Sequence, residues 1–125
     1  MDEINSLLGK AQDAFDDATL LIEHHRNEAA ANRLYYSVFY GIQALLVFKN
    51  EIPKTHKGIH IRFHELFIKP GIFEEEISQH VQMLSNLRQE GDYDLENVTD
   101  DTIQKAKISA EKVLKVVQAY IKGRD

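Results

Sequence analysis

The sequence predicts an all-α protein, an antiparallel bundle of about five helices. Between a few breaks, apolar residues recur every three or four positions, which is the pattern of amphipathic helices. No stretch of useful length alternates apolar and polar residues, as a half-buried strand would. The chain has 125 residues, 43% of them hydrophobic, which suits one globular domain. We therefore expect a single helical domain over residues 1–125.

The first two predicted helices span residues 2–25 and 27–49. The first carries one apolar stripe that includes Ile4, Ala11 and Ala18, with acidic residues off the stripe. The second is apolar on more than one face, so we expect it at the centre of the bundle.

The other three predicted helices span residues 55–68, 73–89 and 100–122. They are separated by breaks at Pro70 and over residues 90–97. Thr55 and Thr99 are the expected N-caps, because a threonine hydroxyl can accept a hydrogen bond from a free N–H of the first turn. Three consecutive glutamates at 74–76 suit the N-terminal end of the fourth helix dipole.

Small residues line one ridge of the second helix: Ser37, Gly41 and Ala44 are spaced i, i+4, i+7. A glycine inside a helix costs ~1 kcal/mol relative to alanine, so it usually has a packing reason. The ridge would let another helix approach closely. That helix could belong to the same chain or to a second copy across a dimer seam.

Composition and charge exclude several classes of protein. The chain has no cysteine, which excludes a disulfide scaffold, a thiolate metal site and a cysteine nucleophile. A net charge of −5 argues against a protein covered in DNA-binding surface. Apolar runs are too short for a membrane span, and the acidic N-terminus lacks a signal-peptide core. We expect a cytoplasmic protein without membrane contact.

A polar stripe crosses the second helix: Arg33, Tyr36, Tyr40 and Gln43 are spaced i, i+3, i+7, i+10. Arginine guanidiniums and tyrosine rings suit phosphate and base recognition. The alternative is that the tyrosines fill the edge of the core and Arg33 pairs with an acid.

Histidines recur on the third helix at positions 56, 60 and 64. Histidines four residues apart can share a metal ion, but the third lies too far away to join them. Residues 54–69 contain four Lys or Arg and one acid, Glu65. We expect no metal here, and interpret His56 and Lys57 as part of an exposed face or of a surface for RNA or nucleotide.

Arg88, near the end of the fourth helix, lies beside the apolar stripe and should be partly buried. A buried guanidinium needs a partner, and Asp92, followed by Tyr93, is a nearby candidate. Residues 73–101 carry nine acids and one base. Together with the basic segment at 54–69, this acidic segment could self-associate or dock a partner.

Several of these blocks occur together and in order along nearly the whole chain. They are residues 31–40 (ANRLYYSVFY), residues 44–46 (ALL), residues 53–58 (PKTHKG), Phe63, residues 67–71 (FIKPG), and Arg88 with Asp92-Tyr93. In this arrangement the sequence resembles the HEPN domain family (higher eukaryotes and prokaryotes nucleotide-binding), most closely its small stand-alone prokaryotic members.

The resemblance implies a helical bundle, like that of nucleotidyltransferase substrate-binding subunits, that commonly dimerises. It also implies a minimal nucleotidyltransferase partner in toxin–antitoxin-like modules. Many family members are metal-independent ribonucleases whose motif is an arginine, at the position of Arg88 here, followed four to six residues later by a histidine. Residues 89–94 read QEGDYD, so that histidine is missing and 2′-hydroxyl attack lacks the family's usual assisting group.

We therefore expect a HEPN-like protein that binds nucleotide or RNA, forms a homodimer and acts with a minimal nucleotidyltransferase, without cofactor or metal. No catalytic residue is assigned. The alternatives are a metal-independent ribonuclease that uses a displaced histidine, His56 or His60, and a pure protein-interaction module that uses the acidic face. The expected binding residues are Arg33, Tyr36, His56, Lys57, Arg88, Asp92 and Tyr93.

Overall fold

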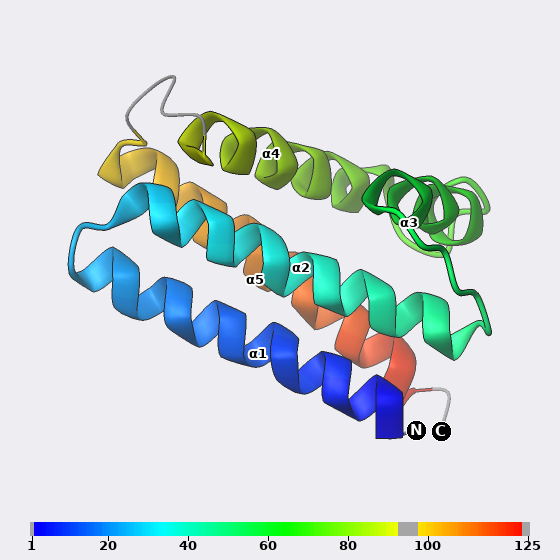
Figure 1. Cartoon of the computed structure of the whole chain (residues 1–125). Coiled ribbons are helices and arrows are strands. Elements are labelled where there is room, and N and C mark those ends of the chain that lie inside the picture. Colours follow the sequence, from blue (N-terminus) through cyan, green and yellow to red (C-terminus); the bar gives the residue numbers. More distant parts are fainter. Residues whose placement is uncertain (1, 93–97, 124–125) are drawn as a thin grey trace.

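The computed structural model describes residues 2–92 and 98–123, with only the backbone of 91 and 92. All regular secondary structure in this part of the chain is helical, without a strand, and the all-α prediction is confirmed (Figure 1). The elements in chain order are α1 (Asp2–Glu23), α2 (Asn27–Phe48), α3 (His56–Phe63), the π-helix η1 (His64–Ile68), α4 (Glu75–Asp92) and α5 (Asp100–Lys122).

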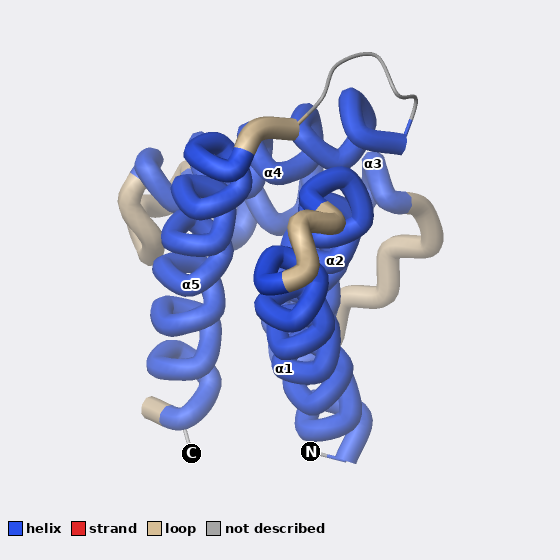
Figure 2. The backbone as a smooth tube through the Cα atoms, turned by 90° about the vertical axis from the view of Figure 1, so that its left-hand side faces the viewer, coloured by secondary structure: helices blue, strands red, loops and turns tan. Residues whose placement is uncertain are grey.

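Helix α2 is the centre of the bundle, as its apolar faces predicted. It packs against α1, α3, α4 and α5, and Leu34, Val38, Ile42 and Leu45 along it are fully buried. Helix α1 runs antiparallel beside α2, and the start of α1 lies at the same end of the bundle as the end of α5 (Figures 1 and 2).

A layer of aromatic rings fastens the segment between α3 and α4 to α5. The rings of Phe67 and Phe73 stack with centroids 5.3 Å apart, and Tyr120 meets both rings edge-on. Offset-stacked and edge-on pairs of this kind contribute ~0.5–1.5 kcal/mol each beyond their buried area. They fix where α3 leaves the bundle and therefore how it crosses α2.

Both predicted caps are confirmed. The hydroxyl of Thr55 accepts a hydrogen bond from the N–H of Gly58 at 2.9 Å, and that of Thr99 accepts one from the N–H of Thr102 at 3.1 Å. Each bond satisfies a backbone donor that the first helical turn leaves free.

Several predicted helix ends differ from the structure. The first helix ends at Glu23, because His25 has a positive φ of 58° and reverses the chain. The fourth helix covers 75–92 and not 73–89. It starts later because Phe73 is buried in the aromatic layer, where its N–H bonds the carbonyl of Phe67. The predicted third helix begins at residue 56 and widens into η1 over its last five residues.

The ridge of small residues on α2 faces the interior of the chain. Ser37 and Ala44 are fully buried, and a Cβ at Gly41 would lie 3.3 Å from Cδ2 of Leu114 and 3.7 Å from Cγ1 of Val117. The ridge lets α5 approach α2, so the interpretation as intramolecular packing is confirmed. The expectation of a dimer seam on this ridge is wrong, because α5 of the same chain already covers it.

Across residues 2–92 and 98–123, no helix combines the length and the apolar character that crossing a bilayer requires.

Candidate functional site

The candidate site is built around Tyr35, in the first half of α2. Its side chain is buried, with 1% of the residue exposed. Its hydroxyl lies 2.9 Å from Nε2 of His60 and 3.5 Å from Nδ1 of His56, both on α3. A buried phenol needs a hydrogen-bond partner, and the i, i+4 histidines supply it from one face of α3.

Arg88 reaches this centre from α4. Its guanidinium carbon lies 4.8 Å from the ring centroid of Tyr35 and 5.8 Å from that of Tyr36, within the range of a cation–π contact. Its Nε is buried. The sequence prediction that Arg88 is partly buried beside the apolar stripe is therefore confirmed.

Arg33 brings a second guanidinium to the same tyrosine. Its guanidinium carbon lies 5.3 Å from the ring centroid of Tyr36, and its Nε and Nη2 donate to Oδ1 of Asn32 at 3.1 and 2.9 Å. These contacts are with a ring and an amide, and not with an acid as the alternative interpretation proposed. Tyr36 is half-buried, so part of this residue remains accessible.

His56 completes the cluster at its open side. It is exposed, yet its ring stacks on Phe39 with centroids 4.2 Å apart and meets the edge of Tyr36 at 6.0 Å. The stacking holds an exposed imidazole in a defined orientation beside the rings of Tyr35 and Tyr36, which the guanidinium of Arg88 also contacts.

Burial sets the charge of the inner groups. It raises the pKa of Tyr35 to about 12, although the charge of Arg88 opposes this shift. Burial also lowers the pKa of His60, and His56 and Arg88 lower it further. At neutral pH Tyr35 is protonated and His60 is neutral, while the guanidiniums are always charged. The site therefore presents positive charge, aromatic surface and neutral hydrogen-bonding groups.

The hydroxyl of Tyr35 couples the two histidines. A phenol has one proton to donate and lone pairs with which to accept. When Tyr35 donates to one imidazole nitrogen, the other histidine must be the donor to it. Because these contacts involve Nε2 of His60 and Nδ1 of His56, the two neutral imidazoles then carry their protons on the same ring nitrogen, either both on Nδ1 or both on Nε2. The tautomer of the half-buried His60 therefore determines whether Nε2 of the exposed His56 is an acceptor or a donor.

Of the predicted binding residues, the structure brings four together: Arg33, Tyr36, His56 and Arg88. Lys57 is exposed in the first turn of α3. Asp92 is the last residue of α4, but its side chain lies outside the described residues, as does the whole of Tyr93. Within the described part of the chain, no three Asp, Glu, His or Cys side chains gather as a metal site would require.

Part of the predicted basic segment is neutralised. Nε of Arg62 lies 2.8 Å from Oε1 of Glu51, and its Nη1 lies 3.4 Å from Oε2 of Glu65. The accessible positive charge of residues 54–69 is therefore smaller than their composition suggests.

Tyr35 and Phe39 lie at helical spacing among apolar residues, as core side chains do, and they were not predicted to lie in the site. The signal for Tyr35 was available: a tyrosine in a fully buried position must find a partner for its hydroxyl. His56 and His60, four residues apart on the predicted third helix, were two side chains that could supply this partner.

Comparison with known protein families fits this arrangement. The HEPN domain model matches residues 4–120. A Thermotoga maritima protein named "UPF0332 protein" is 32% identical over 87% of this chain and 86% of its own length. The Methanocaldococcus jannaschii protein named "Putative toxin MJ0142" is 33% identical over 90% of this chain and 72% of its own length. A second protein of that organism, "Putative toxin MJ0605", is 29% identical over 97% of this chain and 90% of its own length. The match of the family model to nearly the whole chain shows that this protein belongs to the HEPN domain family.

Proposed function

We propose that this protein is a toxin-like HEPN protein that binds nucleotide or RNA in the cluster around Tyr35. The observation that carries the proposal is the position of the Arg88 guanidinium over the rings of Tyr35 and Tyr36, with the exposed imidazole of His56 beside them. The toxin name of two relatives supports the toxin-like role.

The chemistry of the cluster suits a nucleotide. A guanidinium presents a planar fork of donors that matches two phosphate oxygens. The accessible ring surface of Tyr36 and His56 can stack with a base, an interaction worth ~1–3 kcal/mol per base. Because the chain as a whole carries a charge of −5, binding must depend on this local positive site.

Loss of Arg88 tests the binding function. In fluorescence anisotropy with a labelled single-stranded RNA, Arg88→Ala should weaken binding at least about tenfold, or ~1.4 kcal/mol. Arg26→Ala, at an exposed arginine in the turn between α1 and α2, is the matched control and should leave affinity unchanged. Equal affinity of the Arg88→Ala and wild-type proteins, with unchanged circular dichroism, would contradict the proposal.

We further propose a homodimer and a minimal nucleotidyltransferase as partner, as family membership suggests. The cysteine-free composition is compatible with the reducing cytoplasm, the compartment that we propose. Co-expression with a nucleotidyltransferase encoded beside this gene, followed by size-exclusion chromatography with light scattering, tests both points. Elution of this chain as a monomer that leaves the nucleotidyltransferase behind would contradict them.

A second candidate function is metal-independent cleavage of RNA. The observation that favours it is that His56 and His60 meet the same tyrosine that Arg88 covers. A histidine from α3 would then replace the one missing after Arg88. The exposed His56 would take the proton of the 2′-hydroxyl as its oxygen bonds to phosphorus. The bond from phosphorus to the 5′-oxygen of the next nucleotide would break, which leaves a 2′,3′-cyclic phosphate and a 5′-oxygen that takes a proton from solvent. Arg88 would stabilise the charge that develops on the phosphate.

Cleavage of labelled RNA in the presence of EDTA tests this candidate. Activity that both Arg88→Ala and His56→Asn abolish would support it. Absence of cleavage by the wild-type protein would leave binding as the function of the site. Cleavage that persists in both variants would come from a contaminating nuclease.

A further inference from the structure

The polar stripe of α2 continues from the candidate site toward the other end of the bundle. The ring centroids of Tyr36 and Tyr40 lie 6.0 Å apart, and Nζ of Lys10, on α1, lies 5.9 Å from the ring centroid of Tyr40. With Arg33 over Tyr36, cations and half-buried rings are interleaved along one side of α2.

The stripe ends at a cavity. It has a volume of about 280 Å³ and lies between the first half of α1, the second half of α2 and the segment that follows α2. Lys10 and Gln43 belong to both the stripe and the cavity wall, while Leu7, Val47 and Pro53 give the wall its apolar part. A concave, mostly apolar pocket with a few polar groups is the usual form of a small-ligand site.

We infer that the stripe is a track for single-stranded RNA and that the cavity between α1 and α2 is a second base subsite. The inference rests on the proposed function, because the track starts at the Arg88 cluster. From Arg33 to Gln43 the helix rises ~15 Å, at ~1.5 Å per residue. That length corresponds to roughly four stacked nucleotides at ~3.4 Å each, so a mononucleotide cannot occupy both ends.

The distribution of charge fixes which part of the RNA each end receives. Along the stripe, Arg33 and Lys10 lie where backbone phosphates would pass, and the tyrosine rings offer faces on which any base can stack. The cavity wall, in contrast, includes the carboxylate of Glu3, which repels phosphate, and that of Glu51, whose charge Arg62 balances. Carboxylates accept hydrogen bonds from base amino groups, and the amide of Gln43 can donate and accept. The cavity therefore suits a base and not a phosphate.

Binding of oligonucleotides of different length tests the inference. In fluorescence anisotropy, a labelled hexanucleotide should bind at least about tenfold more tightly than a dinucleotide of the same composition. Tyr40→Ala and Lys10→Ala should each remove most of this difference while leaving dinucleotide affinity unchanged. Tyr40→Phe keeps the ring and should keep the difference. Lys105→Ala, at an exposed lysine on α5, is the control for loss of a lysine.

The outcomes separate this inference from the proposed function. The inferred track is wrong if hexanucleotide and dinucleotide bind with equal affinity. It is also wrong if Tyr40→Ala and Lys10→Ala leave hexanucleotide affinity unchanged while Arg88→Ala lowers it. In both cases the proposed binding site around Tyr35 stands. If Arg88→Ala changes neither affinity, the proposed function fails as well. Lys10 is exposed, so Lys10→Ala provides the test even if Tyr40→Ala disturbs folding.

Discussion

The hydroxyl of Tyr35 lies 2.9 Å from Nε2 of His60, and this contact joins the central helix α2 to α3. Helix α3 has only eight residues, of which Ile59 and Phe63 are buried, so one polar contact is a considerable part of its attachment to the bundle. The same contact positions the candidate site, because His56 and His60 share one face of α3. The site and the stability of α3 are therefore coupled.

The first prediction concerns the pH dependence of stability. Burial lowers the pKa of His60 in the folded protein. Below the ordinary histidine pKa of ~6.5 the unfolded chain binds the proton that the folded chain still excludes. The free energy of unfolding should therefore be unaffected by this group above ~6.5 and fall as the pH decreases below it. Urea denaturation between about pH 7.5 and 5 measures the slope.

Two variants isolate His60 in this experiment. His60→Gln should flatten the slope, whereas His64→Gln, at an exposed histidine on the following turn, should retain it. The hydrogen bond with Arg62 lowers the pKa of Glu51. Glu51 therefore stabilises the fold above the ordinary carboxyl pKa, and it loses this effect only at pH values below the range of this experiment. Identical slopes for wild type and His60→Gln would contradict the assignment.

The second prediction separates the hydroxyl of Tyr35 from its ring. Tyr35→Phe removes the partner of His60 but keeps the surface that Arg88 covers. Leaving a half-buried polar group without its partner should cost about 1–3 kcal/mol of unfolding free energy, while RNA affinity should change less than about threefold. Tyr40→Phe, at a half-buried tyrosine, is the control and should change neither value. A large loss of RNA affinity in Tyr35→Phe would show that the hydroxyl itself binds the ligand.

Local rules predicted the helices because each rule acts within a few residues. Thr55 and Thr99 cap helices through bonds to residues three positions away, and the apolar pattern of α2 already indicates burial on several faces. His25 escaped prediction because its positive φ is no strong preference of histidine. The turn that it makes depends on how α1 meets α2.

The candidate site could be predicted only in part. Residue type and spacing singled out Arg33 and Tyr36 as a polar stripe on an apolar helix and Arg88 as a cation beside an apolar stripe. They singled out His56 as one of the regularly spaced histidines of a basic segment. Their meeting at Tyr35 could not be predicted. It depends on the angle at which α3 crosses α2, and contacts distant in sequence fix that angle, including the edge-on contact of Tyr120 with Phe67.

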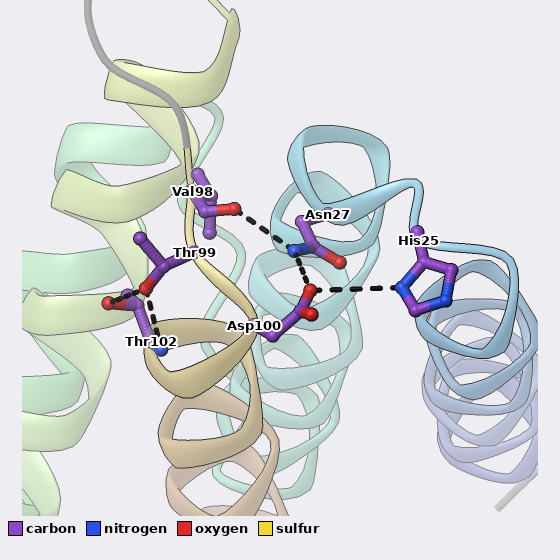
Figure 3. A network of polar contacts seen from close by, with 6 residues as sticks. All are labelled: His25, Asn27, Val98, Thr99, Asp100 and Thr102. Atoms are coloured by element: carbon purple, nitrogen blue, oxygen red, sulfur yellow. Dashed lines mark hydrogen bonds and ion pairs between the residues drawn. The ribbon is translucent and has the colours of Figure 1, made fainter.

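The third prediction concerns the polar network that joins the starts of α2 and α5 (Figure 3). Nδ2 of the buried Asn27 donates to the carbonyl of Val98 at 3.0 Å and to Oδ1 of Asp100 at 2.8 Å. Asn27→Ala should lower the unfolding free energy by about 1–3 kcal/mol because it removes the donor to both oxygens. Asn27→Asp should cost more, because it places a second carboxylate beside Asp100.

Chemical denaturation of these variants is compared with that of His25→Asn. The ring of His25 is 79% exposed and lies 3.9 Å from Asp100, and asparagine tolerates the positive φ at this position. Loss of an exposed pair of this kind should change stability by less than about 1 kcal/mol. Equal stability of Asn27→Asp and wild type would show that the network does not hold the two helices together.

The fourth prediction compares two glycines in helices. A Cβ at Gly41 would meet Leu114 at 3.3 Å and Val117 at 3.7 Å, whereas a Cβ at Gly9 would have no atom within 4 Å. Gly41→Leu should therefore overpack the contact between α2 and α5 and cost at least about 1–3 kcal/mol. Gly9→Leu should be neutral or stabilise by up to ~1 kcal/mol, since leucine is a better helix former than glycine.

Thermal and urea denaturation at two protein concentrations check both variants. A Gly41→Leu protein with wild-type stability would contradict the close approach of α5. A loss that shrinks as protein concentration rises would instead assign Gly41 to a contact between two chains, because only association depends on concentration.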